Sequence, residues 1–178
     1  MSDLFLDVGV TISIQKPELD TIINNLDAMG YQVIGPRIQD HTLKLGPIAE
    51  LSELPYGFST EETAGSYRLV QTGADNYFDI TNGPQSWKQY FFPPVAEMAT
   101  FKKENGHHAR WRTEPNIEKP PRYALLGVRP CDLHAIEIQD KVFMRDQWCD
   151  PKYKRRRTNA FVIVVNCTNP AGTCFCAS

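Results

Sequence analysis

The chain has 178 residues, of which 42% are hydrophobic and 22% charged, as is typical of one globular domain with a substantial core. Its formal net charge of −2 provides no basic field, which argues against a nucleic-acid-binding protein. No apolar run approaches the ~20 residues of a transmembrane helix, and the first residues lack the pattern of a signal peptide. We therefore expect a cytoplasmic protein without membrane insertion, whose thiols stay reduced.

Apolar periodicity in the first half of the chain predicts one helix and two hairpins. The expected elements are a strand over residues 5–14, a helix from Pro17 to Gly30, a strand over 31–34 that ends at Gly35-Pro36, and a return strand over 42–45 after a turn at Asp40-His41. Residues 48–62 are expected to form an irregular connection. A second hairpin is predicted from residues 67–70 and 77–80 around the turn at residues 73–76.

The middle of the chain contains an aromatic group and a polar stretch. Trp87, Tyr90 and Phe91 are expected to close a core rather than to form a partner surface, because aromatic side chains dominate core burial. Residues 102–122 are rich in charge, Pro, Asn and Gly and are expected to form a surface excursion. Within that stretch His107-His108 is a poor metal site, since adjacent side chains do not share a face of a helix or strand.

The last third of the chain predicts a βαβ unit. Residues 123–128 form a short apolar run typical of a buried strand, and residues 160–165 form another. A helix with Asp132 as its N-terminal cap is expected between them. Five basic residues within 152–157 predict a solvated helix face. Two buried-type strands joined by a helical crossover are expected to be parallel, so the fold class is α/β, with α+β as the variant.

Four of the five cysteines follow these two strands. Cys131 comes directly after the first strand and Cys167 after the second, while Cys174 and Cys176 return from a loop that contains Gly172. The carboxyl ends of parallel strands meet at one edge of a sheet, where open α/β folds place their sites. Cys131 also lies at a helix start, where the helix dipole is expected to lower the pKa of its thiol. The thiols are therefore expected to converge.

An all-thiol ligand set suits an iron–sulfur cluster or a structural zinc ion, and free or redox-active thiols remain a further alternative. The spacing has neither the paired knuckles of most zinc sites nor the bacterial ferredoxin run. A thiol oxidoreductase working through Cys174 and Cys176 ranks lower, because no Cys-x-x-Cys begins a helix. Cys149 lies apart from the other four and is expected to be a partly buried bystander.

These motifs resemble a known family. The segments Gly127-Val128-Arg129-Pro130-Cys131-Asp132-Leu133, Asn166-Cys167-Thr168 and Gly172-Thr173-Cys174-Phe175-Cys176 are similar to β subunits of soluble sulfhydrogenases, which accompany NiFe hydrogenases, and to the iron–sulfur A subunits of anaerobic sulfite reductases. Residues 83–88, 92–94 and 31–36 resemble the same family. The likeness spans most of the chain, and its cysteine-bearing motifs are the specific part.

The resemblance implies an iron–sulfur electron-transfer subunit that relays electrons between a flavin/NAD(P)-binding partner and a catalytic hydrogenase or reductase subunit, rather than an enzyme on its own. It implies a [4Fe-4S] cluster whose ligands are Cys131, Cys167, Cys174 and Cys176. Gly127, Gly172 and Arg129 are expected around the cluster, the glycines as sources of N–H donors and Arg129 as a compensating charge, with a surface ion pair as the alternative role for Arg129. The alternative function is a non-redox α/β assembly or binding module with zinc or nothing at the thiols.

The resemblance also bears on domain organisation. Family members carry a later domain with ferredoxin-like Cys-x2-Cys-x2-Cys-x3-Cys-Pro runs, and these 178 residues contain no such run. We therefore expect residues 1–178 to be a single α/β domain that corresponds to the N-terminal part of a longer iron–sulfur subunit.

Overall fold

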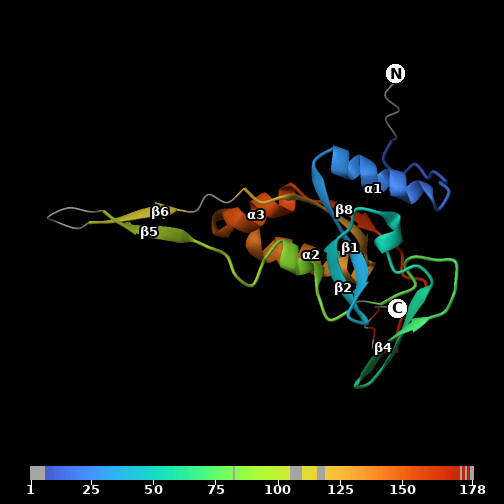
Figure 1. Cartoon of the computed structure of the whole chain (residues 1–178). Helices are drawn as coiled ribbons and strands as arrows, with labels where there is room; N and C mark the ends of the chain where they lie inside the picture. Colours follow the sequence, from blue (N-terminus) through green and yellow to red (C-terminus); the bar gives the residue numbers. More distant parts are fainter. Residues whose placement is uncertain are drawn as a thin grey trace.

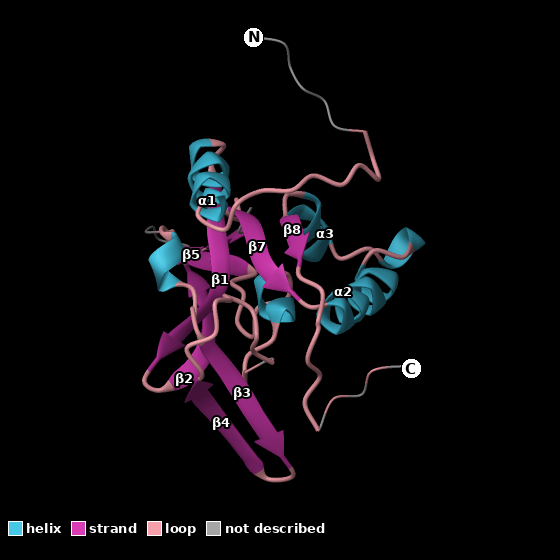
Figure 2. Ribbon diagram, turned by 90° about the vertical axis from the view of Figure 1, so that its right-hand side faces the viewer, coloured by secondary structure: helices cyan, strands magenta, loops and turns pink. Residues whose placement is uncertain are grey.

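A four-stranded mixed sheet organises the fold in the order β2-β1-β7-β8. Figure 1 gives the overall arrangement, and Figure 2 shows β7 between β1 and β8. The computed structural model describes residues 7–81, 83–104, 110–115, 119–172, 174 and 176. Strands β1 and β2 pair antiparallel, whereas β1, β7 and β8 run parallel to one another. The bounds of these strands are β1 (Tyr31–Gln39), β2 (Thr42–Pro47), β7 (Arg122–Val128) and β8 (Phe161–Val164). The predicted α/β class and the parallel pairing of the last two strands are confirmed.

In the part of the chain that the structure describes, three α-helices and three short 3-10 turns accompany the sheet. Helix α1 follows Pro17 and ends before Gly30, whose φ of +80° few other residues would adopt. Helices α2 and α3 lie on the crossover between β7 and β8. Among the described residues, no helix has both the length and the apolar character needed to cross a membrane. The bounds are α1 (Glu18–Ala28), η1 (Leu51–Glu53), η2 (Trp87–Tyr90), α2 (Pro130–Phe143), η3 (Asp146–Trp148) and α3 (Pro151–Thr158).

The cap of α2 differs from expectation. Arg129 occupies the N-cap position and makes no side-chain capping bond, while Asp132 lies inside the first turn. The capping aspartate belongs instead to α3, where the Asp150 carboxylate accepts the backbone N–H groups of Lys152 and Tyr153 at 2.8 and 2.9 Å. Pro130 is the first residue of α2, where a backbone N–H would have no partner within the helix. Because proline lacks this N–H, the helix start has one donor fewer to satisfy, and α2 begins without a side-chain cap.

Two further antiparallel ribbons lie outside the central sheet. β3 (Phe58–Thr63) pairs with β4 (Ser66–Gln71), as Figure 2 shows, and β5 (Ala99–Lys103) pairs with β6 (Trp111–Pro115). The predicted pairing of residues 67–70 with 77–80 is therefore wrong, and so is the irregular conformation expected for 58–62. The backbone around Phe78 and Ile80 is not available for a ladder, because the carbonyls of both residues accept hydrogen bonds from Arg129.

Two other strand predictions also need correction. Residues 7–14 of the expected first strand form no ladder with any described residue, and Val8, Val10 and Ile12 are exposed; residues 5 and 6 lie outside the described part. Strand β1 does not end at Gly35-Pro36 but continues to Gln39, with Pro36 opposite Leu45 of β2. The turn at Asp40-His41 is confirmed, with φ of 54° and 56° at the two residues.

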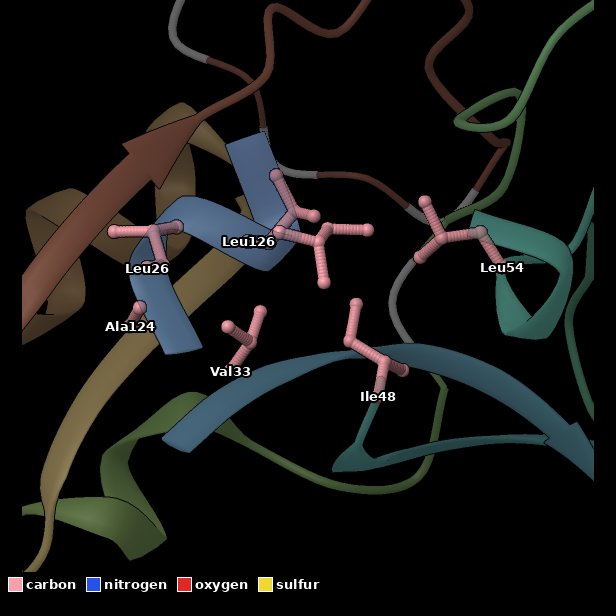
Figure 3. Packing of buried hydrophobic residues seen from close by; sticks show 7 residues of the cluster. Leu26, Val33, Ile48, Leu54, Ala124 and Leu126 are labelled. Carbon is pink, nitrogen blue, oxygen red and sulfur yellow. The ribbon is translucent and has the colours of Figure 1, made fainter. Parts of the chain in front are cut away.

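The core consists of two clusters that share β1 and β7. Neighbouring residues of these strands enter different clusters, because successive side chains of a strand point to opposite faces. One cluster, seen in Figure 3, includes Leu126 and packs α1 against the sheet; it contains Ile23, Leu26, Val33, Ile48, Leu54, Ala124 and Leu126. The other contains Ile34, Trp87, Phe91, Leu125, Val128, Ile136 and Tyr153. The core role expected for Trp87 and Phe91 is thus confirmed.

A β-bulge at Gly127 shapes the end of β7. The register with β8 shifts between Leu126 and Val128, and Gly127 has a φ of +97°. The extra residue moves Val128 into the cluster of Leu125, which a regular strand would have left to residue 127. The bulge therefore sets the direction in which the chain leaves the sheet toward Arg129 and α2.

Candidate functional site

The carboxyl ends of β7 and β8 lie side by side, as parallel neighbours must. The N–H of Val165 donates to the carbonyl of Val128 at 2.8 Å, which continues the pairing just past the end of β8. Cys131 lies in the first turn of α2, directly after β7, and Cys167 follows β8. The fold therefore brings two sequence-distant cysteines to the same edge of the sheet.

All four predicted cysteines line one pocket at this edge. The pocket has a volume of about 490 Å³. All four residues are exposed, and none of them forms a disulfide. The pocket is lined by Thr81, Arg129, Pro130, Cys131, Asn166, Cys167, Cys174 and Cys176. The convergence expected from the strand arrangement is present in the structure.

The four cysteines share a pocket, but their side chains do not meet at a single point. Within the part of the chain that the structure describes, no three His, Cys, Asp or Glu side chains are close enough together to hold one metal ion. Cys131 and Cys176 are near enough for the charge of one to influence the titration of the other. The four cysteines therefore line one pocket without closing into the ligand shell of a single zinc ion, in which every sulfur lies about 2.3 Å from the metal.

The pKa of the Cys131 thiol is raised, opposite to the expected direction. Burial of the thiol is the largest cause, although the residue as a whole is exposed, and the negative charge of Asp132 is the next. Backbone N–H groups at the start of α2 act in the lowering direction, as the helix terminus predicts, but they are outweighed. Cys131 is therefore a protonated thiol in the metal-free protein, and metal binding there would release a proton.

Arg129 is the most constrained side chain of the pocket wall. It is 7% exposed, and its guanidinium donates to the carbonyls of Phe78 and Ile80 and, at 3.3 Å, to that of Asn166. Among the described residues, none provides a carboxylate partner for it. A buried guanidinium whose charge is balanced only by carbonyl dipoles favours an anion nearby. The positive charge predicted beside the cysteines is thus at the pocket wall.

The two glycines expected around the site lie next to the pocket without lining it. Gly127 and Arg129 line a smaller adjoining cavity, and a Cβ on Gly127 would come within 2.9 Å of the Phe78 ring. Gly172 is exposed in a turn in which the N–H of Cys174 donates to the carbonyl of Ala171 at 3.1 Å. Gly127 therefore permits close packing behind Arg129, and Gly172 lies in the turn that returns the chain to the pocket.

Thr81 is a pocket residue that sequence reasoning missed. Its N–H donates to Thr60 Oγ1 at 2.8 Å and its hydroxyl donates to Glu62 Oε1 at 3.2 Å, so β3 holds it in place. Nothing in the residues around position 81 marks a site, because this threonine reaches the pocket only through the tertiary path of residues 72–81. Only the contact between Thr81 and β3, which the sequence does not reveal, identifies it as a pocket residue.

Three other predicted features lie away from the pocket. Cys149 is partly buried between α2 and α3 and donates weakly to the carbonyl of Asp150 at 3.9 Å. The basic stretch at 152–157 is not simply a solvated face, because Arg156 is 5% exposed and the Arg157 Nε lies 3.0 Å from the Asp140 carboxylate. The pair His107-His108 lies outside the described residues.

Comparison with known proteins connects half of the chain to a named relative. The chain is 46% identical over 91 residues to sulfhydrogenase 2 subunit beta of Pyrococcus furiosus, a match that covers 51% of this chain and 24% of that protein. This match confirms the resemblance to hydrogenase β subunits, and the matched part spans about a quarter of the relative's length. No protein-family profile and no solved structure matches the chain.

Proposed function

We propose that this chain forms the cluster-binding part of an iron–sulfur subunit in a cytoplasmic hydrogenase or sulfur- or sulfite-reductase complex. The observation that carries the proposal is the single pocket lined by Cys131, Cys167, Cys174 and Cys176. Its relative is named as a subunit of a sulfhydrogenase, which supports a role within a multi-subunit complex. The match covers 24% of that relative, so the activity, the electron acceptor and the partner subunits of the whole complex are proposed here as well.

The residues present fit a [4Fe-4S] cluster. Such a cluster is held by four thiolates, one on each iron, so its ligands surround a volume instead of meeting at one atom. Four cysteines that line one pocket of about 490 Å³ are suited to such a ligand set, whereas a zinc ion would require the thiols to close in further. When bound, a cluster supplies one-electron transfer, with a potential set by charge, hydrogen bonds and burial.

Arg129 is suited to stabilise the negatively charged ligand set. Four thiolates bring a charge that the pocket must offset, and the guanidinium is the buried cation in its wall. Because Arg129 donates to the carbonyls of Phe78, Ile80 and Asn166, its position is set before any ligand arrives. A fixed positive charge favours the more reduced, more negative state of a redox group, and so raises its potential.

The role that fits these groups is an electron relay between a flavin/NAD(P)-binding partner and a catalytic subunit. Within the described residues, the pocket holds thiols, one guanidinium, one threonine and one asparagine, and lacks a paired acid and base. This part of the protein would therefore pass electrons and leave bond-making chemistry to a partner. The 178 residues would correspond to the first part of such a subunit.

Anaerobic iron, zinc and sulfide analysis after reconstitution with iron and sulfide tests the proposal. We expect about four irons and four sulfides per chain, with broad brown absorbance. Serine substitution at Cys131, Cys167 or Cys174 should remove most of the iron, because serine is a poor ligand for a cluster. Cys149→Ser is the matched control, since Cys149 lies off the pocket, and it should retain the full content.

Three outcomes would contradict the cluster assignment. One zinc per chain with no sulfide would identify a structural site and favour the assembly-module alternative. No metal at all would assign the thiols another role. Equal iron loss in Cys149→Ser and Cys131→Ser would show that the iron is not held by the pocket.

A further inference from the structure

The β5–β6 ribbon projects away from the rest of the protein as an arm (Figure 1). It lies far from the four-cysteine pocket, and an inference about it does not depend on a cluster. The ribbon has two strands only, so the outer edge of each is free of ladder partners among the described residues. Isolated two-stranded ribbons are marginally stable in water, and free edges readily pair with other chains. Contact with another chain would stabilise an arm of this kind.

The strand register divides the arm into two unlike faces. Phe101 pairs with Thr113 and Lys103 pairs with Trp111, so Phe101 and Trp111 share one face. Lys102 pairs with Arg112 on the opposite face, where Lys102 Nζ also lies 2.6 Å from Glu114 Oε2. The ribbon therefore has two unlike faces: one carries the two aromatic rings together with Lys103, and the other carries Lys102, Arg112 and Glu114.

The aromatic face is uncovered. Phe101 is 64% exposed and Trp111 is 67% exposed. Val95 and Met98, which lead into the arm, are also largely exposed. Burying a large apolar side chain against a partner contributes favourably to binding, and tryptophan is among the residues most enriched at the energetic centres of interfaces. A partner that covered this face would gain several such contributions.

A pocket of about 520 Å³ lies where the arm joins the body. Both connections of the arm contribute to it, through Pro93, Pro94 and Val95 before β5 and through Pro120 and Pro121 after β6. The Lys152 ammonium of α3 donates to the carbonyl of Glu97 and ties this root to the body. The pocket therefore lies at the base of the arm, where a bound chain could also occupy it.

Charge indicates which kind of partner fits. The arm carries four basic side chains, Lys102, Lys103, Arg110 and Arg112, against Glu104 and Glu114. Its net charge is +2, although that of the whole chain is −2. Two copies meeting arm to arm would bring like charges together, and an arm placed on the body of a second copy would be a head-to-tail contact that need not close. The complementary surface is acidic and belongs to a different chain.

We propose that the β5–β6 arm is a docking arm for a second, different protein chain that presents an acidic surface around an apolar slot. The slot receives Phe101 and Trp111, and the acidic rim faces Lys103, the basic side chain on the same face of the ribbon. The free edges of β5 and β6 allow backbone pairing with an extended segment of the partner. Nucleic acid is less suited, because the apolar face offers two separate rings and the net charge is small.

Site-specific photo-crosslinking in cells that make the full chain tests this proposal. The photoreactive amino acid p-benzoylphenylalanine is introduced at position Phe101 or Trp111, and at position Thr100 or Arg112 as the matched controls on the other face. We expect one other polypeptide to be crosslinked from the first two positions, with a yield at least about tenfold above the controls. The crosslinked segment should be rich in Asp and Glu, and raising the salt from about 0.05 to about 0.5 M should lower the yield severalfold.

Several results would overturn the proposal. These are equal crosslinking from both faces, crosslinks only to a second copy of this chain, crosslinks to nucleic acid or lipid, and no crosslinks. A crosslinked segment without acidic residues, or a yield unaffected by salt, would also contradict the proposed partner chemistry. Circular dichroism of each purified variant shows whether the fold is kept, so that a folding defect is not mistaken for lost docking.

Discussion

Arg129 joins three segments of the chain through one planar side chain. Its guanidinium reaches the carbonyls of Phe78 and Ile80 in the path from β4 to η2, and that of Asn166 after β8. A guanidinium offers five donors in a fixed fork, whereas an ammonium is a compact point charge on a flexible stem. The planar shape of the guanidinium, and not only its charge, therefore allows Arg129 to bind the three carbonyls of the pocket wall.

We expect Arg129→Lys to lower the free energy of unfolding by about 2 kcal/mol, because a lysine cannot satisfy all three buried carbonyls. Arg129→Met should cost more, about 3 kcal/mol or above, since every carbonyl then loses its donor. Urea denaturation measures both. Arg112→Lys on the exposed arm is the control and should change the value by less than about 0.5 kcal/mol. An unchanged stability in Arg129→Lys would contradict the role given to the fork.

At the scale of single elements, the bulge in β7 sets the direction of the backbone between the end of β7 and the start of α2. The Gly127 φ of +97° belongs to the left-handed half of backbone space, and there is no room for a side chain at this position. A Cβ would lie 2.9 Å from Phe78 Cε1 and 3.3 Å from Pro36 Cδ. Backbone strain and steric clash therefore both exclude other residues.

A pair of glycine substitutions separates these two effects. Gly30 also has a positive φ, +80°, but no heavy atom lies within 4 Å of the place where its Cβ would be. Gly30→Ala should therefore cost only the backbone strain, about 1 kcal/mol, while Gly127→Ala should cost about 2–4 kcal/mol. Thermal and urea denaturation give both values. Equal costs for the two variants would show that the contact with Phe78 is relieved by movement.

At the scale of the whole molecule, burial of several tyrosines makes the stability of the fold depend on pH in the alkaline range. Burial raises the pKa of Tyr67 and of Tyr90 to about 12, and burial is also the main reason why the pKa of Tyr153 is raised. Tyr153 is fully buried, and its hydroxyl donates to Asp140 Oδ1 at 2.7 Å. The folded protein thus holds these hydroxyls in their neutral form.

The contribution of these tyrosines to the free energy of unfolding should be constant below about pH 9 and fall as the pH rises from about 10 toward 12. In that range the unfolded chain releases its tyrosine protons while the folded protein still binds them, so the unfolded state is favoured by rising pH. Urea denaturation at a series of pH values checks this slope. Tyr153→Phe should make the slope shallower, and an unchanged slope in this variant would contradict the assignment to Tyr153.

The sequence by itself determined the features that depend on neighbouring residues. Residues 123–128 are apolar enough to be a buried strand, and the motifs at Cys131 and Cys167 follow two such strands, so the parallel pairing and the meeting of the thiols could be predicted. The turn at Asp40-His41 was predictable for the same reason. Local composition decides these features, because strand propensity and turn chemistry act within a few residues.

The tertiary structure alone decided which strand pairs with which and what surrounds the site. Residues 7–14 alternate like a strand but have no ladder partner among the described residues, and β4 pairs with β3 rather than with residues 77–80. Thr81 and the three carbonyls around Arg129 reach the pocket from distant parts of the chain. Alternation alone fixed neither the conformation of residues 7–14, which contain a turn at residues 8–9, nor the partner of β4. The burial that raises the pKa of Cys131 comes from residues that only the fold brings near.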